Sequence, residues 1–142
     1  MTFRHVADMV QDKDPVTLPE TATVQVACQK MRDRRVGAVL VTDKRHRLVG
    51  IFTGRDAVIR MLAEGRNPVS TQLLDVMTAR PTTLPPAVTS VDALRLMQDG
   101  GFRHVPIVAE DGRVVGVVSR GDFRGLEQAR LDEERGLLER IR

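Results

Sequence analysis

The sequence predicts an α+β protein made of two pseudo-symmetric β-α-β-β-α repeats that pack sheet to sheet. The first observation is a duplicated motif: Gly50-Ile51-Phe52-Thr53-Gly54-Arg55-Asp56 returns 66 positions later as Gly116-Val117-Val118-Ser119-Arg120-Gly121-Asp122. The second is that 17–56 and 83–122 align without a gap. A fixed offset over this length marks a duplicated unit. Because one repeat of this size buries too little surface to be stable alone, we expect the two copies to pack together.

The residues of the first repeat predict its elements in chain order. A threonine before apolar residues at spacings of three and four is typical of a helix cap, and a nearly continuous β-branched run is typical of a buried strand. A residue before proline avoids the α region, and glycine often ends a helix. The expected elements are an extended segment at 16–19, a helix capped by Thr23 that runs to about Arg34, a strand at 36–42, a second strand at 47–52 and a helix from Thr53 to Gly65.

The second repeat follows the same order, and a short apolar segment precedes each repeat, at 2–10 and at 69–77. The expected elements of the second repeat are an extended segment at 81–85, a helix capped by Ser90 and ended by Gly100-Gly101, strands at 102–108 and 113–118, and a helix opened by Ser119. We therefore divide the chain into a first repeat at 1–66, a second repeat at 67–125 and a C-terminal helical extension at 126–142.

The C-terminal extension mixes apolar residues with many arginines and glutamates. Ion pairs four residues apart support such a helix in solvent by a few tenths of a kcal/mol each. Two hypotheses are open at this point: a solvated helical tail, or a stripe that packs on a second subunit. The apolar residues concerned are Leu126, Ala129, Leu137, Leu138 and Ile141.

Composition narrows the possible partners. The 22 basic and 19 acidic residues leave a net charge of +3, and the basic residues alternate with acids along the chain. A nucleic-acid binder concentrates its basic residues in one patch. Tyr and Trp are absent, and single-strand binding relies on such aromatic rings. These features argue against a nucleic-acid partner. Binding through the arginine surplus is a third hypothesis, which predicts a steep salt dependence.

The single cysteine, Cys28, excludes an internal disulfide and suits a reducing compartment. No apolar run approaches the roughly 20 residues of a membrane span, and the N-terminus lacks the apolar core of a signal peptide. We expect a cytoplasmic protein with no membrane partner.

Motifs of enzymes are missing from the sequence. His5, His46 and His104 lie far apart and have no partner at metal-ligand spacing, so no metal site is expected. A Gly-Lys-Thr/Ser phosphate loop for nucleotide hydrolysis is absent, and no nucleophile–base pair stands out. We expect no catalytic activity and no required cofactor.

The duplicated motif resembles that of a known family. The chain contains two tandem β-α-β-β-α units. Before its last helix, each unit has Gly, two apolar residues, Thr or Ser, two spacers and Asp. In these features the chain is similar to a pair of CBS domains. The name comes from cystathionine β-synthase, and the pair is called a Bateman module. The strands at 36–41 and 103–108 match as well, and the resemblance to a stand-alone pair covers nearly the whole chain.

The resemblance implies the CBS fold and a regulatory function. Such modules bind adenine nucleotides (AMP, ADP or ATP, and in some members NAD-type ligands or S-adenosylmethionine) in clefts between the repeats. They form homodimers and change the behaviour of a partner protein. The adenine nucleotide would thus be a regulatory ligand, and the regulated protein is unknown.

The hydroxyl–aspartate pairs of the motif, Thr53 with Asp56 and Ser119 with Asp122, have two explanations. The structural one is a capping box, in which the hydroxyl and the carboxylate each accept from the other residue's amide. The functional one follows the resemblance: Asp56 and Asp122 hold ribose hydroxyls, a task for a two-oxygen acceptor, and Thr53 and Ser119 lie at the phosphate. A local cap needs neither the preceding glycine nor a copy in register. We therefore favour the ligand role.

The resemblance assigns further residues to the ligand. Thr17 and Thr83 match first-strand positions that line the base pocket, and the alternative is an ordinary extended strand start beside proline. Val39 and Val105 would contact adenine, although each is equally consistent with a plain core residue.

A basic pair, Arg103 and His104, occurs in the second repeat, where it is well placed to contact phosphate. The aligned residues of the first repeat are Gly37 and Ala38, so we expect two chemically unequal sites. The alternative for Arg103 is a surface ion pair. Two more phosphate candidates inside the motif are Arg55 and Arg120.

The sequence thus supports a sensor that binds adenine nucleotides between two repeats, does no chemistry and passes the signal to a partner. The alternative is a constitutive dimerisation or scaffold module whose clefts bind nothing, with the hydroxyl–aspartate pairs serving only as caps.

Overall fold

The computed structural model describes residues 3–140 and forms two compact units of mixed α and β structure. The first-repeat unit contains 14–82 and 110–114. The second-repeat unit contains the residues up to 13, 83–109 and the residues from 115 onward. The α+β class predicted from the sequence is confirmed.

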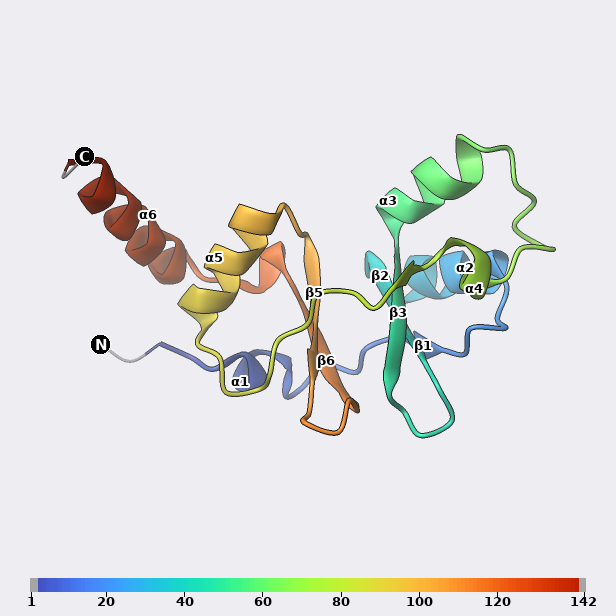
Figure 1. Ribbon diagram of the computed structural model, residues 1–142, viewed down its shortest axis with the longest axis horizontal. Coiled ribbons are helices and arrows are strands. Elements are labelled where there is room, and N and C mark those ends of the chain that lie inside the picture. Colours follow the sequence, from blue (N-terminus) through green and yellow to red (C-terminus); the bar gives the residue numbers. More distant parts are fainter. Residues whose placement is uncertain (1–2, 141–142) are drawn as a thin grey trace. The chain divides into compact units, whose positions relative to one another are not determined.

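The first-repeat unit is built on a four-stranded sheet with the order β1-β2-β3-β4. β1 runs parallel to β2, whereas β2–β3 and β3–β4 are antiparallel, and β2 and β3 form the longest pair (Figure 1). All five residues of β2 are buried, as the apolar run in the sequence predicts. The strands are β1 (Thr17–Leu18), β2 (Ala38–Thr42), β3 (Leu48–Thr53) and β4 (Thr78–Ala79).

The helices of this unit start and end where local chemistry favours it. The Thr23 side chain accepts a hydrogen bond from the Val26 amide at 3.3 Å, which caps α2 as predicted. Gly65, at φ 66°, follows the π-helix in the left-handed region that suits glycine. The helices are α2 (Val24–Arg34), α3 (Gly54–Asp56), a π-helical continuation (Ala57–Leu62) and α4 (Leu73–Val76).

The second-repeat unit has a two-stranded sheet of β5 and β6. Leu84 adds an isolated parallel bridge to Ile107, in the place that β1 occupies in the first repeat. Gly101, at φ 71°, ends α5 as the sequence predicts. The elements are α1 (Val6–Val10), α5 (Ser90–Gly100), β5 (His104–Val108), β6 (Val114–Ser119), a 3-10 turn (Arg120–Asp122) and α6 (Gly125–Arg140).

Two predicted helix starts in the second repeat are wrong. The cap of α5 is Thr89, whose side chain accepts from the Asp92 amide at 3.3 Å, because Ser90 is already helical and fully buried. Ser119 opens only a 3-10 turn, since Phe123 is extended and packs against the core of this unit, and α6 begins at Gly125.

The segment that precedes each repeat packs in the unit of the other repeat. In the second-repeat unit, the α1 residues Val6 and Val10 are buried, and the Val6 amide donates to the Val88 carbonyl at 2.9 Å. The Arg4 Nε pairs at 2.9 Å with Glu127, whose side chain is only 3% exposed. In the first-repeat unit, the α4 residues Leu73 and Val76 belong to the hydrophobic cluster, and β4 adds an edge strand beside β3. The repeat boundaries at 66/67 and 125/126 stay a prediction about the sequence.

We call the segments that precede the two repeats, at 2–10 and 69–77, the covering segments. Gly116 in β6 and Gly50 in β3 allow them to approach these strands closely. A Cβ on Gly116 would lie 2.7 Å from the Cβ of Val10, and a Cβ on Gly50 would lie 2.5 Å from the Sδ of Met77. Real Cβ atoms essentially never show contacts under 3.0 Å. Gly116 is therefore required for packing against Val10, whereas a Cβ on Gly50 would require the Met77 side chain to shift.

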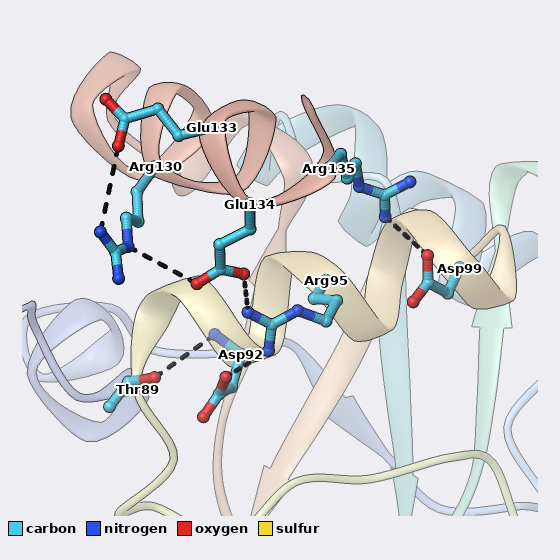
Figure 2. A network of polar contacts seen from close by, with 8 residues as sticks. All are labelled: Thr89, Asp92, Arg95, Asp99, Arg130, Glu133, Glu134 and Arg135. Atoms are coloured by element: carbon cyan, nitrogen blue, oxygen red, sulfur yellow. Dashed lines mark hydrogen bonds and ion pairs between the residues drawn. The ribbon is translucent and has the colours of Figure 1, made fainter. Parts of the chain in front are cut away.

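The C-terminal helix α6 packs along α5 of its own unit (Figure 2). The Arg135 guanidinium pairs with Asp99 at 2.6 Å, and Arg95 pairs with Glu134. Leu131 is only 1% exposed. This helix therefore has apolar as well as ionic support within the chain.

The two hypotheses for the C-terminal extension are both compatible with these contacts. The i,i+4 pair of Arg130 with Glu134, at 3.5 Å, matches the solvated-helix hypothesis. Leu137 is 60% exposed, which leaves an apolar side chain for a second subunit. Ile141 and the side chains of Leu126 and Leu138 lie outside the described residues.

Replacing Gly116 with Ala should lower the free energy of unfolding by about 1–3 kcal/mol, the usual range for overpacking, because the new methyl group meets Val10. Gly136→Ala in α6 is the control, since nothing lies within 4 Å of a Cβ there. It should leave stability unchanged or raise it by up to about 1 kcal/mol. Urea unfolding followed by circular dichroism measures both. Wild-type stability of the Gly116 variant would contradict the close approach.

Candidate functional site

The motif of the first repeat forms a complete capping box. Thr53 ends β3 with extended dihedral angles, so its side chain faces the first turn of α3. The Thr53 amide donates to Oδ2 of Asp56 at 3.0 Å, and the Thr53 hydroxyl donates to the same oxygen at 3.2 Å. In return, the Asp56 amide donates to the Thr53 hydroxyl oxygen at 3.3 Å. The capping-box explanation of the Thr53–Asp56 pair is therefore confirmed.

The second repeat reproduces this geometry with serine in place of threonine. The Ser119 amide donates to Oδ2 of Asp122 at 2.7 Å, and the Ser119 hydroxyl donates to it at 3.1 Å. Both hydrogen bonds to the carboxylate oxygen of the first repeat thus recur in the second. In both repeats the carboxylate uses one oxygen for the cap.

The other oxygen of each carboxylate faces a basic side chain. Oδ1 of Asp56 lies 3.6 Å from Nε of Arg60 one turn later, and Oδ1 of Asp122 is paired with the Lys13 ammonium. The side chains of Asp56 and Asp122 are 13% and 16% exposed. Because the cap uses only Oδ2, it leaves Oδ1 to its basic neighbour and to any further donor.

Lys13 is a residue of this site that sequence reasoning missed. It lies 109 positions before Asp122 and reaches it only because the segment before the first repeat packs in the second-repeat unit. Spacing in the sequence gives no sign of this contact. Burial acts to raise the pKa of Asp122, but the hydrogen bonds from Lys13 and Ser119 outweigh it and hold the pKa below its ordinary value. Asp122 is therefore ionised at neutral pH.

The basic pair Arg103-His104 belongs to the second-repeat unit, together with Asp122. His104 begins β5 and is half-buried, whereas Arg103 is exposed. Burial lowers the pKa of the His104 imidazole below its ordinary value, Asp122 acts to raise it, and Arg103 lowers it further. His104 is therefore neutral at pH 7 and lies near enough to Asp122 to feel its charge.

The two arginines inside the motif differ in their contacts. Arg55 is exposed. The Arg120 guanidinium donates to the carbonyl oxygens of Phe102 at 2.9 Å and Met97 at 3.1 Å, at the C-terminal end of α5. A cation at this end of a helix also interacts favourably with the helix dipole. Arg120 thus has a structural role, and the phosphate role of both arginines stays a prediction.

The predicted base-pocket residues are not gathered around the aspartates. Thr17 lines a cavity of about 450 Å³ with residues from the β1–α2 connection and the β2–β3 turn, and neither Thr53 nor Asp56 lines that cavity. Thr83 is half-buried next to the Leu84 bridge. Their role toward a base stays a prediction.

Val39 and Val105 are both 0% exposed and lie in the hydrophobic clusters of their units. Their side chains therefore act as core residues in this structure, in line with the simpler of the two sequence interpretations. Contact with adenine stays a prediction.

Within residues 3–140, no cluster of three or more His, Cys, Asp or Glu side chains is placed to hold a metal ion. In the same part of the chain, no helix combines the length and the apolar character needed to span a membrane.

Comparison with known proteins identifies the family. The CBS domain family matches the chain twice, at residues 6–63 and 73–127. The chain therefore belongs to the CBS domain family and carries two copies of the domain, as the sequence resemblance indicated.

Relatives and solved structures agree with this assignment. The Arabidopsis thaliana CBS domain-containing protein CBSCBSPB3 is 41% identical over 103 residues, which cover 72% of this chain and 18% of the relative. The chain thus spans about a fifth of the length of that relative. The CBS domain protein PAE2072 from Pyrobaculum aerophilum, complexed with AMP, has a TM-score of 0.81 and 25% identity over 92% of this chain and 99% of that chain.

A second solved structure shares the fold. The CBS domain pair of protein MJ0100, in complex with 5′-methylthioadenosine and S-adenosyl-L-methionine, has a TM-score of 0.76 and 22% identity over 94% of this chain and 99% of that chain. CBS pairs of this fold thus occur with different adenosine-containing ligands.

The His104 pKa provides a direct test of the second-repeat site. An NMR titration of the imidazole should give a pKa below 6.5, the ordinary histidine value. Asp122→Asn removes the carboxylate that raises this pKa, so the pKa should fall further. A pKa above 6.5 in the wild-type protein, or no change in the variant, would contradict the described surroundings of His104.

Proposed function

We propose that this chain is a non-catalytic sensor that binds an adenosine-containing ligand through Asp56 and Asp122. The observation that carries the proposal is the second oxygen of each carboxylate, Oδ1, which the cap does not use and which faces only a basic side chain. The cap occupies Oδ2 and leaves Oδ1 of a largely buried carboxylate without a backbone donor. Ribose presents two neighbouring hydroxyls, and an ionised carboxylate is acceptor-only, which suits them. The AMP complex of the similar CBS domain protein from Pyrobaculum aerophilum supports this ligand class.

The two sites are proposed to differ in their preference for phosphate. The second-repeat unit contributes Lys13, Arg103 and His104, whereas Gly37 and Ala38 align with Arg103 and His104 in the first repeat and Asp56 faces Arg60. A phosphate beside His104 would raise the pKa of its imidazole and add a positive charge. We therefore assign the stronger preference for a phosphorylated ligand to Asp122, with Thr53 and Ser119 nearest the phosphate in their sites.

Signalling is proposed to follow from linkage. A ligand that binds one arrangement of the two repeats more tightly shifts the population toward it. A partner protein that prefers the same arrangement then binds more tightly, and the effect is reciprocal. No bond needs to form or break in this mechanism.

A scaffold that binds no ligand is the alternative function. The observation in its favour is that in both repeats the carboxylate accepts hydrogen bonds from the amide and the hydroxyl of the capping residue, so the repeated pairs have a structural role without any ligand. The scaffold and the sensor predict different results for a variant that keeps the caps but removes the proposed ribose acceptor.

Asp→Asn replacement at both positions separates these roles. An asparagine keeps one acceptor oxygen for the cap and replaces Oδ1 with an amide nitrogen, which cannot accept from ribose. Hydrogen bonds to a charged group contribute about 1.5–3 kcal/mol, so titration calorimetry should show AMP affinity at least about tenfold weaker in Asp56→Asn/Asp122→Asn. The melting temperature should fall less than in a variant that also lacks the caps, because only the ion pairs with Arg60 and Lys13 are lost.

The control is the Asp56→Ala/Asp122→Ala pair, which removes the caps as well. It should lose AMP binding and also lower stability, since each cap contributes about 0.5–2 kcal/mol. Unchanged AMP affinity in the asparagine variant would overturn the ribose assignment. A wild-type protein that binds no adenosine compound would favour the scaffold.

We further propose that the module forms a homodimer through the π-helical segment after α3. Its side chains Val58, Ile59 and Leu62 are 56%, 48% and 78% exposed, and neighbouring exposed apolar side chains are typical of a protein–protein contact. A second copy of the chain is the occupant implied by the family.

Leu62→Lys places a charge in this apolar face and should convert the dimer to a monomer in size-exclusion chromatography with light scattering. Val69→Lys is the control, because Val69 is 59% exposed but lies outside the helix. It should leave the dimer intact. A Leu62 variant that remains dimeric would show that the copies meet elsewhere.

A further inference from the structure

The turns of the two hairpins meet inside the first-repeat unit. The Leu48 amide donates to the Gly112 carbonyl at 3.0 Å, and the Val114 amide donates to the His46 carbonyl at 3.0 Å. These bonds flank an antiparallel bridge between Arg47 and Arg113. The β2–β3 turn and the β5–β6 turn are therefore held together by backbone hydrogen bonds.

The bridge places two arginines in an unfavourable register. Residues directly opposite each other in an antiparallel pair have Cβ atoms about 4.5–5.5 Å apart and side chains on the same face. Like charges in this position are destabilising. Arg47 and Arg113 occupy it, although many neutral residues would fit an exposed turn. A destabilising arrangement of this kind calls for a compensating charge.

The arginines surround a hollow. Arg45, Arg47, Asp111 and Arg113 line a volume of about 450 Å³. This volume lies within the range of about 300–1,000 Å³ that is usual for small-molecule sites. Three guanidinium groups and one carboxylate give the lining a net positive charge.

The acids nearby neutralise only part of this charge. Asp43 accepts from the amides of Arg45 and Arg47 at 2.9 and 3.0 Å and pairs with the Arg47 guanidinium at 2.9 Å. Asp111 accepts from the Arg113 amide at 3.1 Å, which ties it to its own turn.

Within the described part of the chain, neither the Arg45 nor the Arg113 guanidinium has an acidic partner. The remaining charged residues of the two turns, Lys44 and Glu110, are exposed and of opposite sign. They therefore cancel in net charge and leave the hollow positive.

We propose that this hollow binds the phosphate chain of an oligophosphate. The planar guanidinium group matches phosphate oxygens with paired donors. Three such groups around one hollow suit several linked phosphates better than a single small anion. Binding would supply a negative partner for Arg45 and Arg113, whereas Arg47 already pairs with Asp43.

The hollow is separate from the proposed nucleotide site. Arg47 immediately precedes β3 and Thr53 ends it, so the two lie at opposite ends of a six-residue strand, about 20 Å apart at the usual rise per residue. A mononucleotide held at Asp56 therefore does not reach the hollow. The oligophosphate proposal and the nucleotide-sensing function can therefore each be tested and rejected without affecting the other.

Titration calorimetry and thermal shift of the full chain with tripolyphosphate, at constant ionic strength, test the proposal. The wild-type protein should bind it and melt at a higher temperature. Arg45→Gln/Arg113→Gln should bind at least tenfold more weakly. The control Arg66→Gln/Arg124→Gln removes the same charge at exposed positions outside the hollow and should bind like the wild type.

A second measurement is independent of binding strength. Without any added anion, Arg45→Gln/Arg113→Gln should be at least as stable as the wild type, because it relieves the like-charge contact. Equal binding of tripolyphosphate by this variant and the wild type, or no binding by the wild type, would overturn the proposal.

The asparagine variant distinguishes the two sites. Tripolyphosphate should still bind Asp56→Asn/Asp122→Asn, and loss of its binding there would place the anion at the aspartates and overturn the proposal. Displacement of the bound tripolyphosphate by ATP in this variant would assign the hollow to the phosphate chain of a nucleotide. Binding without displacement would assign it to a free oligophosphate.

Discussion

Each unit of this protein depends on a covering segment that comes from before the other repeat. The contact is close: a Cβ on Gly116 would overlap Val10, and a Cβ on Gly50 would require the flexible Met77 side chain to shift. The first glycine of the motif therefore serves packing in both units. The same close approach places Lys13, three residues after Val10, beside Asp122. The packing of the covering segment thus determines the charge environment of one half of the candidate site.

The aspartates of the motif stabilise the chain locally and, in our proposal, also bind the ligand. One oxygen of each carboxylate completes the turn from strand to helix, and the other lies free of the backbone. A short motif that must do both is constrained at every position: the hydroxyl and the aspartate close the cap, and the glycine admits the covering segment. The basic residues around Asp122 then differ from those around Asp56, so one architecture can offer two unequal sites.

Much of this organisation could be predicted from the sequence, because it is local or repeated. The Thr23 cap, the glycine end of α5 and both capping boxes follow from residues within one turn of each other. The Thr89 cap was missed because Thr89 and Ser90 are adjacent hydroxyl residues, and burial of Ser90 decides between them. The break before α6 reflects Gly121 and Gly125, which favour helix poorly, together with Phe123, which packs against the core. The Lys13–Asp122 pair and the meeting of the two turns join residues far apart in the chain, which no local pattern reveals.

The central claim is that the two aspartates give this CBS pair an adenosine-containing ligand. A thermal-shift scan of the wild-type protein with AMP, ADP, ATP, NAD, NADH and S-adenosylmethionine at millimolar concentration tests it most directly. A ligand at about 100 times its dissociation constant adds roughly 2.7 kcal/mol of stability, which raises the melting temperature of a domain this size by several degrees. The account predicts such a rise with at least one of these compounds. No rise with any of them would contradict the sensor and leave the scaffold as the function of this module.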